Sequence, residues 1–437
     1  MTKFMGLIMR HLSIKLNNIF LPIALLILVG CQQSPSIPQN NSGGLAANYD
    51  GGHEMPQSAR PNDATISLYE ERKASFISRR NRQGQLYIVM PKGNSVDFLF
   101  DANKSSLILE KELSEGYILS YLYYENGRVK YNGIAKNGRF KNNITDETVF
   151  FTHSTGKSIT SYIVGHAICE GYIKSIDELI DWPMMSKTLY QGQSLRNLLN
   201  MNAGDRHTVD EASTRVMGSP IHHRAMGLDT IAAALEGTKK RGNEVFYNNF
   251  LSDVIANYVA FKSGGNYDQL MAKVFQDKIK IKNKVTYERH GMSLTNGRKS
   301  IYYGKAETLA SYSYQMTRLD FLRVAEAMMK DYQNQTCVGK YLKEIQNQAL
   351  DWPKYRPGQN INSMLWIHNY AKKYGAQFYF DFYGMSGRNI FATEGLNGQN
   401  MMIDMDNSRI IVTNSAATAW DQRVFMLDVI KNGELPK

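Results

Sequence analysis

Two stretches with a period of two, one on each side of a long helical region, constrain most strongly what this chain can fold into. Residues 116–134 alternate as GYILSYLYYENGRVKYNGI, and residues 399–415 alternate as QNMMIDMDNSRIIVTNS. In the first stretch, Asn126-Gly127 stands where a two-residue hairpin turn needs positive φ angles. Helical periodicity dominates between the two, as in NFLSDVIANYVAFKSGG at residues 249–265.

We therefore expect an α/β fold of the α+β kind, in which an antiparallel sheet completed by both ends of the domain is flanked by helices. An all-helical subdomain is expected at about residues 155–300, inserted between the strands. The hydrophobic content of 43% over 437 residues is enough for a sizeable core. The folded domain is expected to cover residues 66–437.

The N-terminal segment differs in kind from the rest. Lys3, Arg10 and Lys15 precede the apolar run IFLPIALLILVG, which has the length of a signal-peptide core and is too short to span a bilayer as a mature helix. The run ends at Leu28-Val29-Gly30-Cys31, which resembles the bacterial lipobox. We predict a lipoprotein signal peptide over residues 1–30 and lipidation of Cys31. The alternative is a plain N-terminal anchor with an incidental cysteine.

Residues 31–65 are rich in Ser, Pro, Asn, Gly and Gln without an apolar period, which predicts a disordered tether. Gln32, rather than aspartate, follows the cysteine, so we expect a lipid-anchored protein of the bacterial cell envelope. The outer membrane, facing the periplasm, is favoured over the inner membrane. The formal net charge is +11, but no clustered Lys and Arg with interleaved aromatics occur, so no nucleic-acid partner is expected.

The other two cysteines, Cys169 and Cys337, lie far apart in the sequence. Because Cys169 falls inside an amphipathic helix, we expect a buried free thiol rather than a disulfide or a metal ligand. The pair His222-His223 lacks the third ligand that a zinc site needs. No metal and no organic cofactor are expected.

The stretch FFTHSTGKSITSYIVGHA at residues 150–167 allows three interpretations. A phosphate-binding loop would need a glycine five residues before Gly156-Lys157-Ser158, and Phe151 stands there, which disfavours nucleotide binding. A capped helix with a solvated Lys157 fits the same residues. Alternatively, because residues i and i+3 share a helix face, Lys157 Nζ can reach Ser154 Oγ and act as the base of a nucleophile.

This last pattern resembles the first motif of the serine hydrolases built on the class C β-lactamase, DD-peptidase and 6-aminohexanoate-dimer hydrolase fold. The following SITSYIVGHAICEGYIKSIDELI is similar to the next helix and the Gly-Tyr-Ile turn of that family, and QSLRNLLNMNAGD is similar to its LLtMtSG segment. The resemblance covers about residues 116–437. It implies a β-lactamase/transpeptidase-like fold, with Ser154 as the nucleophile and Lys157 as its base.

The second motif of the family, Tyr-x-Asn, is matched by Tyr247 and Asn249 in FYNNF, about 90 residues after Lys157. The resemblance implies that Tyr247 is catalytic and passes a proton to the leaving group, and that Asn249 contacts the substrate. A lone Tyr-x-Asn would more often be a packed core tyrosine, so the interpretation depends on the order and spacing of the motifs.

The third motif, usually Lys-Thr-Gly or His-x-Gly, falls on Thr393-Glu394-Gly395 in ATEGLNGQNMMID. The resemblance implies that Thr393 faces the substrate and that Gly395 lets the substrate lie against the strand. The amide of Leu396, with that of Ser154, would form an oxyanion hole. Otherwise, Gly395 is simply a bulge or turn residue.

Thr393 carries no charge where the family places a cation, so neutral esters or linear amides should be preferred to β-lactams, unless a residue such as Arg388 supplies the cation. The sequence thus predicts a serine hydrolase for a small ester, amide or peptide, held at the membrane by its lipid. The alternative is a catalytically weak or inactive penicillin- or peptidoglycan-binding envelope lipoprotein. The sequence predicts no oligomeric state.

Overall fold

The computed structural model describes residues 86–136, 144–210, 216–219, 221, 227–283, 285–289, 307–352, 366–417 and 420–437. All of them belong to one compact unit, Asn40–Lys437. The expected signal peptide, Cys31, the tether and the His222-His223 pair lie outside the described residues. Within the described ranges, no helix combines the length and apolarity needed to cross a bilayer.

The larger sheet has nine strands, and it joins the two ends of the domain as the sequence predicts. The hairpin turns at Asn126 and Gly127, whose φ angles are 50° and 85°. Strand β14 then pairs antiparallel with β3, so the C-terminal hairpin extends the N-terminal one. In sheet order the strands are β2 (Leu99–Phe100), β4 (Arg128–Ile134), β3 (Ile118–Glu125), β14 (Arg409–Ser415), β13 (Gln399–Asp404), β12 (Ile390–Gly395), β11 (Phe378–Phe382), β10 (Ala371–Gly375) and β9 (Leu350–Asp351).

A second sheet of five short strands is not predicted from the sequence. Its strands are β1 (Leu86–Val89), β6 (Thr286–Arg289), β8 (Gln315–Thr317), β5 (Val149–Phe151) and β7 (Thr308–Leu309), which pairs with β6. Strand β6 lies inside the span that was expected to be all helical. Strand β5 leads directly into the stretch that carries Ser154, so this sheet fixes the entry to the candidate site.

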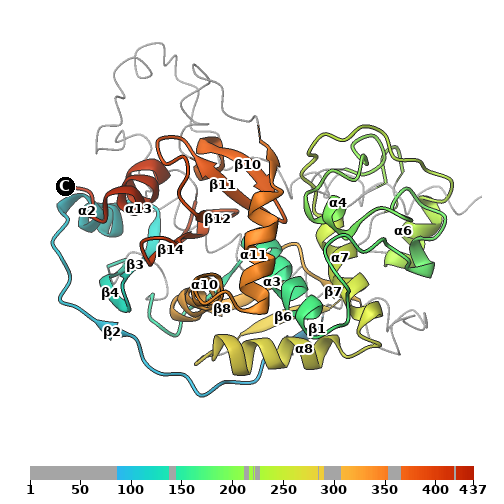
Figure 1. Cartoon of the computed structure of the whole chain (residues 1–437). Coiled ribbons are helices and arrows are strands. Elements are labelled where there is room, and N and C mark those ends of the chain that lie inside the picture. Colours follow the sequence, from blue (N-terminus) through green and yellow to red (C-terminus); the bar gives the residue numbers. More distant parts are fainter. Residues whose placement is uncertain are drawn as a thin grey trace, which may run out of the picture. The chain divides into compact units, whose positions relative to one another are not determined.

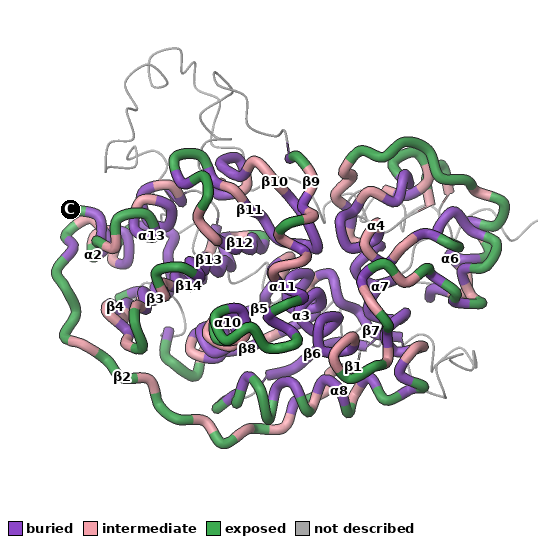
Figure 2. Tube along the Cα trace, viewed as in Figure 1, coloured by how far each residue is buried: buried purple, intermediate pink, exposed green. Residues whose placement is uncertain are grey.

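Most helices lie around the sheets, but one of them, α3, lies at the centre of the molecule. Every residue from Thr155 to Ala167 in α3 is buried, so α3 is enclosed on all faces rather than amphipathic (Figure 2). The helices are α2 (Leu107–Glu115), α3 (Thr155–Cys169), α4 (Leu195–Leu199), α6 (Leu228–Ala234), α7 (Phe250–Lys262), α8 (Tyr267–Lys273), α10 (Arg318–Gln333), α11 (Cys337–Asn347) and α13 (Asp428–Asn432). Short 3₁₀ or π turns are η2 (Pro183–Met185), η3 (Val274–Ile279), η4 (Ile367–Tyr370) and η5 (Arg423–Leu427).

A disulfide joins Cys169, the last residue of α3, to Cys337, the first residue of α11, with the two Cα atoms 5.9 Å apart. The expectation of a free thiol at Cys169 is therefore wrong. The two helices lie side by side (Figure 1), and a Cβ on Gly165 would lie 2.5 Å from the ring of Tyr341. Sequence separation concealed this proximity, because the helices meet only through tertiary packing.

Candidate active site

A strained turn presents Ser154 at the start of α3. The turn is anchored by Thr152, whose N–H and hydroxyl both donate to the carbonyl of Tyr314, at 2.9 and 3.1 Å. His153 then adopts a left-handed conformation with φ of 48°, which is uncommon for a residue with a side chain. The side chain of Ser154 makes no helix-capping bond. The capped-helix interpretation therefore does not explain this serine.

Lys157 is buried beneath Ser154, with 1% of its surface exposed, so it is not a solvated lysine. Its Nζ lies 3.0 Å from Ser154 Oγ, 2.6 Å from Asn249 Oδ1 and 2.9 Å from the carbonyl oxygen of Ser311. These three oxygens belong to a hydroxyl, a side-chain amide and a peptide bond. A neutral amine can donate to the amide and the carbonyl while its lone pair accepts the hydroxyl proton of Ser154.

The second predicted motif, Tyr247 and Asn249, lies beside Lys157. The ring of Tyr247 lies beside the lysine, with its centroid 5.0 Å from Lys157 Nζ, and it meets the ring of Tyr374 edge-on at 6.0 Å. Asn249 occupies the first turn of α7, at its N-cap. The structure thus brings Ser154, Lys157, Tyr247 and Asn249 together from the N-terminal ends of two helices, α3 and α7, that lie far apart in the sequence.

The carbonyl of Ser311 is a contact of the lysine that the sequence does not predict. The segment that carries it is held by α7, because Asp253 Oδ1 accepts from the N–H groups of Ala310 and Ser311 at 2.7 and 3.0 Å. One turn later, Asn257 exchanges two 2.8 Å bonds with the backbone of Thr308. The available signal was Asp253 and Asn257, two buried polar residues four apart in a largely apolar helix.

A second unpredicted support holds Asn248, the residue after Tyr247. Asp205 is fully buried, and its Oδ2 accepts from the hydroxyl of Tyr190 at 2.9 Å and from Asn248 Nδ2 at 3.2 Å. Burial raises the pKa of Asp205 to about 6. Because Asn248 stands between Tyr247 and Asn249, this carboxyl group fixes the backbone of the second motif.

Strand β12 carries the third predicted motif, in which Thr393 faces α3 and Gly395 faces the turn before it. The hydroxyl of Thr393 lies 3.0 Å from that of Thr155 and accepts from the N–H of Met401 at 3.0 Å. With 1% of its surface exposed, Thr393 is engaged within the protein rather than offered to a substrate. A Cβ on Gly395 would lie 2.3 Å from the carbonyl oxygen of Thr152. The missing side chain of Gly395 therefore leaves room for the turn before Ser154. The role expected from the sequence was to leave room for a substrate.

Two backbone groups remain available at the turn and at the end of the strand. Among the described residues, the N–H groups of Ser154 and Leu396 donate to no protein acceptor. Leu396 is 50% exposed. Because Gly395 packs against Thr152, the end of β12 lies close to the start of α3, where two such donors can serve one oxygen atom.

The charged residues near the third motif are arranged differently from expectation. Arg388, the candidate replacement for the missing cation, is engaged by Asp404 and by the carbonyl of Ile430. Glu394 leaves β12 on the face opposite to Thr393, and its Oε2 lies 2.7 Å from Nδ1 of His368 and accepts from the His368 N–H at 3.1 Å. The ionisable side chain beside the third motif is therefore an acidic one, in contact with a histidine.

Comparison with solved structures identifies the fold. The chain is similar to a Bacillus anthracis protein assigned as a 6-aminohexanoate-dimer hydrolase, with a TM-score of 0.57 and 13% identity over 85% of this chain and 98% of that one. It is also similar to a protein from Bacteroides dorei DSM 17855 assigned as a β-lactamase, with a TM-score of 0.51 and 13% identity over 82% and 97% of the two chains. The fold is β-lactamase/transpeptidase-like. The resemblance predicted from the sequence is confirmed at this level.

A third solved structure, the octameric penicillin-binding protein homologue from Pyrococcus abyssi, is similar with a TM-score of 0.50 and 14% identity, covering 73% of this chain and 74% of that one. No protein-family model and no curated protein matches the sequence. At these identities the likeness concerns the fold, so the chemistry has to be argued from the residues of this chain.

Proposed function

We propose that the protein is a serine hydrolase that forms an acyl-enzyme on Ser154 and hydrolyses an ester or amide bond. The observation that carries the proposal is the buried Lys157 amine, 3.0 Å from Ser154 Oγ. Burial favours the neutral amine over the ammonium, and the positive end of α3 adds to this preference. A neutral Lys157 can take the proton of Ser154 as the hydroxyl attacks the substrate carbonyl.

The other residues then have separate roles. The N–H groups of Ser154 and Leu396 stabilise the oxyanion. Tyr247, beside the lysine, passes the proton to the leaving group, and Asn249 holds Lys157 through its 2.6 Å contact. The C–O or C–N bond of the substrate then breaks, and the leaving group departs with the proton that Ser154 lost. Water next attacks the acyl-enzyme: its oxygen ends in the carboxylic acid product, and its proton returns to Ser154.

A fluorophosphonate probe tests the proposal, because it phosphonylates an activated serine. We expect one adduct on the peptide that contains Ser154, and none in Ser154→Ala or Lys157→Ala. Ser158→Ala is a matched control, since Ser158 is also buried in α3 but donates to the Gln377 carbonyl at 2.5 Å. An unlabelled wild-type protein would overturn the proposal and favour a penicillin- or peptidoglycan-binding role.

We also propose that the protein works in the cell envelope, anchored by a lipid on Cys31. The disulfide between Cys169 and Cys337 supports this location, because such bonds persist in oxidising compartments such as the periplasm and are rare in the bacterial cytosol. The second support is the lipobox-like sequence that ends at Cys31.

A further inference from the structure

Glu394 occupies a position from which it can select the substrate. It comes directly before Gly395 and two residues before Leu396, whose N–H is a proposed oxyanion donor. Two residues of a strand span roughly 7 Å. Thr393 and Gly395 face α3 and the turn before Ser154, so the side chain of Glu394 points to the other face of β12.

The carboxylate of Glu394 is buried and incompletely paired. Its side chain is 5% exposed, and its ion-pair partner among the described residues is His368. Both contacts with His368 use Oε2, whereas Oε1 is buried without a hydrogen-bond partner in the described part of the chain. A buried carboxylate oxygen without a donor is costly, so a donor supplied by a ligand would be favourable.

The surroundings of this carboxylate are aromatic. The ring of His368 stacks on Tyr379 with centroids 5.9 Å apart and meets Trp366 edge-on at 5.3 Å. Tyr379 in turn packs on Tyr374, and Tyr374 packs on the catalytic-site residue Tyr247. Aromatic faces beside a carboxylate suit an organic ammonium group, which gains both the ion pair and a cation–π interaction.

One edge of β12 is only partly paired beside Glu394. The strand pairs with β13 over its whole length, but with β11 only where Tyr379 meets Ala392. From Thr393 to Gly395, this edge is therefore not paired with β11. An extended acyl group that lies along the edge, with its carbonyl oxygen at Leu396, would bring a substituent roughly 7 Å away, about two residues along, to Glu394.

We propose that Glu394, held by His368, selects ester or amide substrates that carry a primary ammonium group close to the scissile bond. This inference rests on the proposed acyl transfer at Ser154. It replaces the neutral esters and amides expected from the sequence by esters and amides that carry a positive charge, and it disfavours substrates with a carboxylate at the same place.

The test compares D- and L-alanine p-nitroanilide and alanylalanine p-nitroanilide with their N-acetyl and N-succinyl derivatives. Within each set the amino end is an ammonium group, a neutral acetamide or a succinamide that ends in a carboxylate, so its charge changes from positive to neutral to negative. For at least one set we expect the wild-type kcat/KM to be higher by about 10- to 100-fold for the ammonium form than for the N-acetyl form, with the N-succinyl form lowest. In Glu394→Gln the ratio of kcat/KM between the ammonium form and the N-acetyl form should fall to near 1. The ammonium substrate loses its partner carboxylate, whereas the N-acetyl substrate retains its rate.

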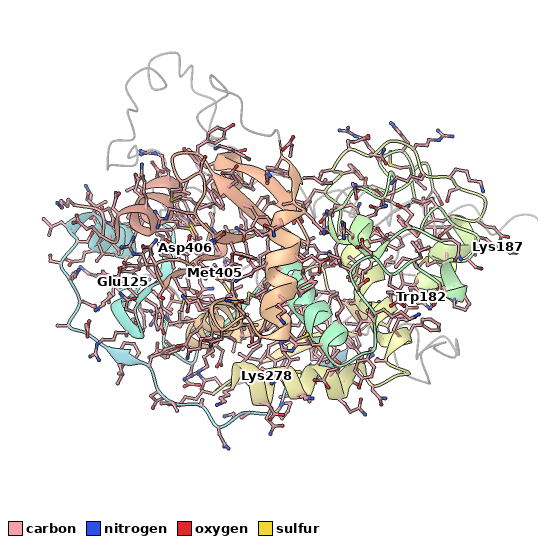
Figure 3. All side chains as sticks on the ribbon, in the orientation of Figure 1. Glu125, Trp182, Lys187, Lys278, Met405 and Asp406 are labelled. Carbon is pink, nitrogen blue, oxygen red and sulfur yellow. A yellow bond between two sulfur atoms is a disulfide. The ribbon has the colours of Figure 1, made fainter. Side chains whose placement is uncertain are left out.

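Glu236→Gln is the matched control, since it also removes one negative charge but at the exposed ion pair with Lys187, which Figure 3 labels. It should leave the ratio unchanged. Fluorophosphonate labelling of Ser154 in each variant reports an intact site independently of substrate charge. A wild-type ratio near 1 in every set, or a ratio that survives in Glu394→Gln, overturns this inference, whereas an unlabelled Ser154 overturns the proposed function itself.

Discussion

Replacing Asp205 by Asn removes a carboxyl group whose ionisation is opposed by burial. The pKa of Asp205 is about 6 in the folded protein, whereas an aspartate in an unfolded chain titrates near 3.9. Between about pH 4 and pH 6 the folded state therefore holds this proton and the unfolded state has lost it. The free energy of unfolding then falls as the pH rises, because the unfolded state binds fewer protons.

The size of the effect follows from the two pKa values. A difference of about two units corresponds to about 3 kcal/mol of unfolding free energy, at 1.36 kcal/mol per unit. The contribution of the protonated group is fully present below about pH 4 and is lost above about pH 6. Relative to Asp205→Asn, wild type should thus lose about 2 kcal/mol between pH 4 and pH 7, because the unfolded-state carboxyl group is already half ionised at pH 4.

Urea unfolding at several pH values between 4 and 7, followed by tryptophan fluorescence, measures this difference for the two proteins. Asp351→Asn is the control, because Asp351 is exposed, and its curve should remain nearly parallel to that of wild type. If the curves of wild type and Asp205→Asn were parallel across this range, the carboxyl group would not titrate as burial demands. Its role in holding Asn248 would then need another explanation.

Three further changes test other parts of the structure. Gly395→Ala should cost roughly 1–3 kcal/mol of stability and slow fluorophosphonate labelling, because its Cβ would lie 2.3 Å from the Thr152 carbonyl oxygen; unchanged melting and labelling would contradict the close approach. Cys337→Ala should lower stability by about 2–5 kcal/mol, and reductant should lower wild type to the same level by breaking its bond to Cys169; a wild-type melting temperature insensitive to reductant would refute the bond. Cys31→Ser should release the protein from the membrane fraction or leave it unprocessed, and normal processing with full retention would exclude the lipid anchor.

Local rules of sequence were sufficient for much of the fold. The turn at Asn126 and Gly127 requires positive φ angles, and α7 has both a helical period and two glycines after its end. The second sheet could not be found in this way, because its strands have two to four residues and carry too little periodicity. The disulfide was also hidden, since its two helices approach each other only in the folded protein.

In the candidate site, too, local contacts could be predicted from the sequence and tertiary contacts could not. Ser154 and Lys157 are three residues apart on one helix, so their contact can be predicted from helical geometry alone. Tyr247 and Asn249 required the resemblance to a family, because nothing local links them to α3. Ser311 could not be predicted at all, since it contributes a backbone carbonyl, which any residue type could supply.

The third motif shows how strand geometry changes the meaning of a sequence match. In the sequence comparison, Thr393 occupies the position where the resembled family has a cationic residue, which suggested only that a positive charge was missing. In the strand, however, Thr393 faces α3 and bonds to Thr155, while its neighbour Glu394 faces the opposite side. The side chain of Thr393 is therefore occupied by its contact with α3, whereas in the proposed binding mode the substrate would meet the carboxyl group of Glu394. The preference of the enzyme for a charged substrate should accordingly depend on Glu394. Substitutions of Glu394 should change the preferred charge of the substrate without disturbing Ser154.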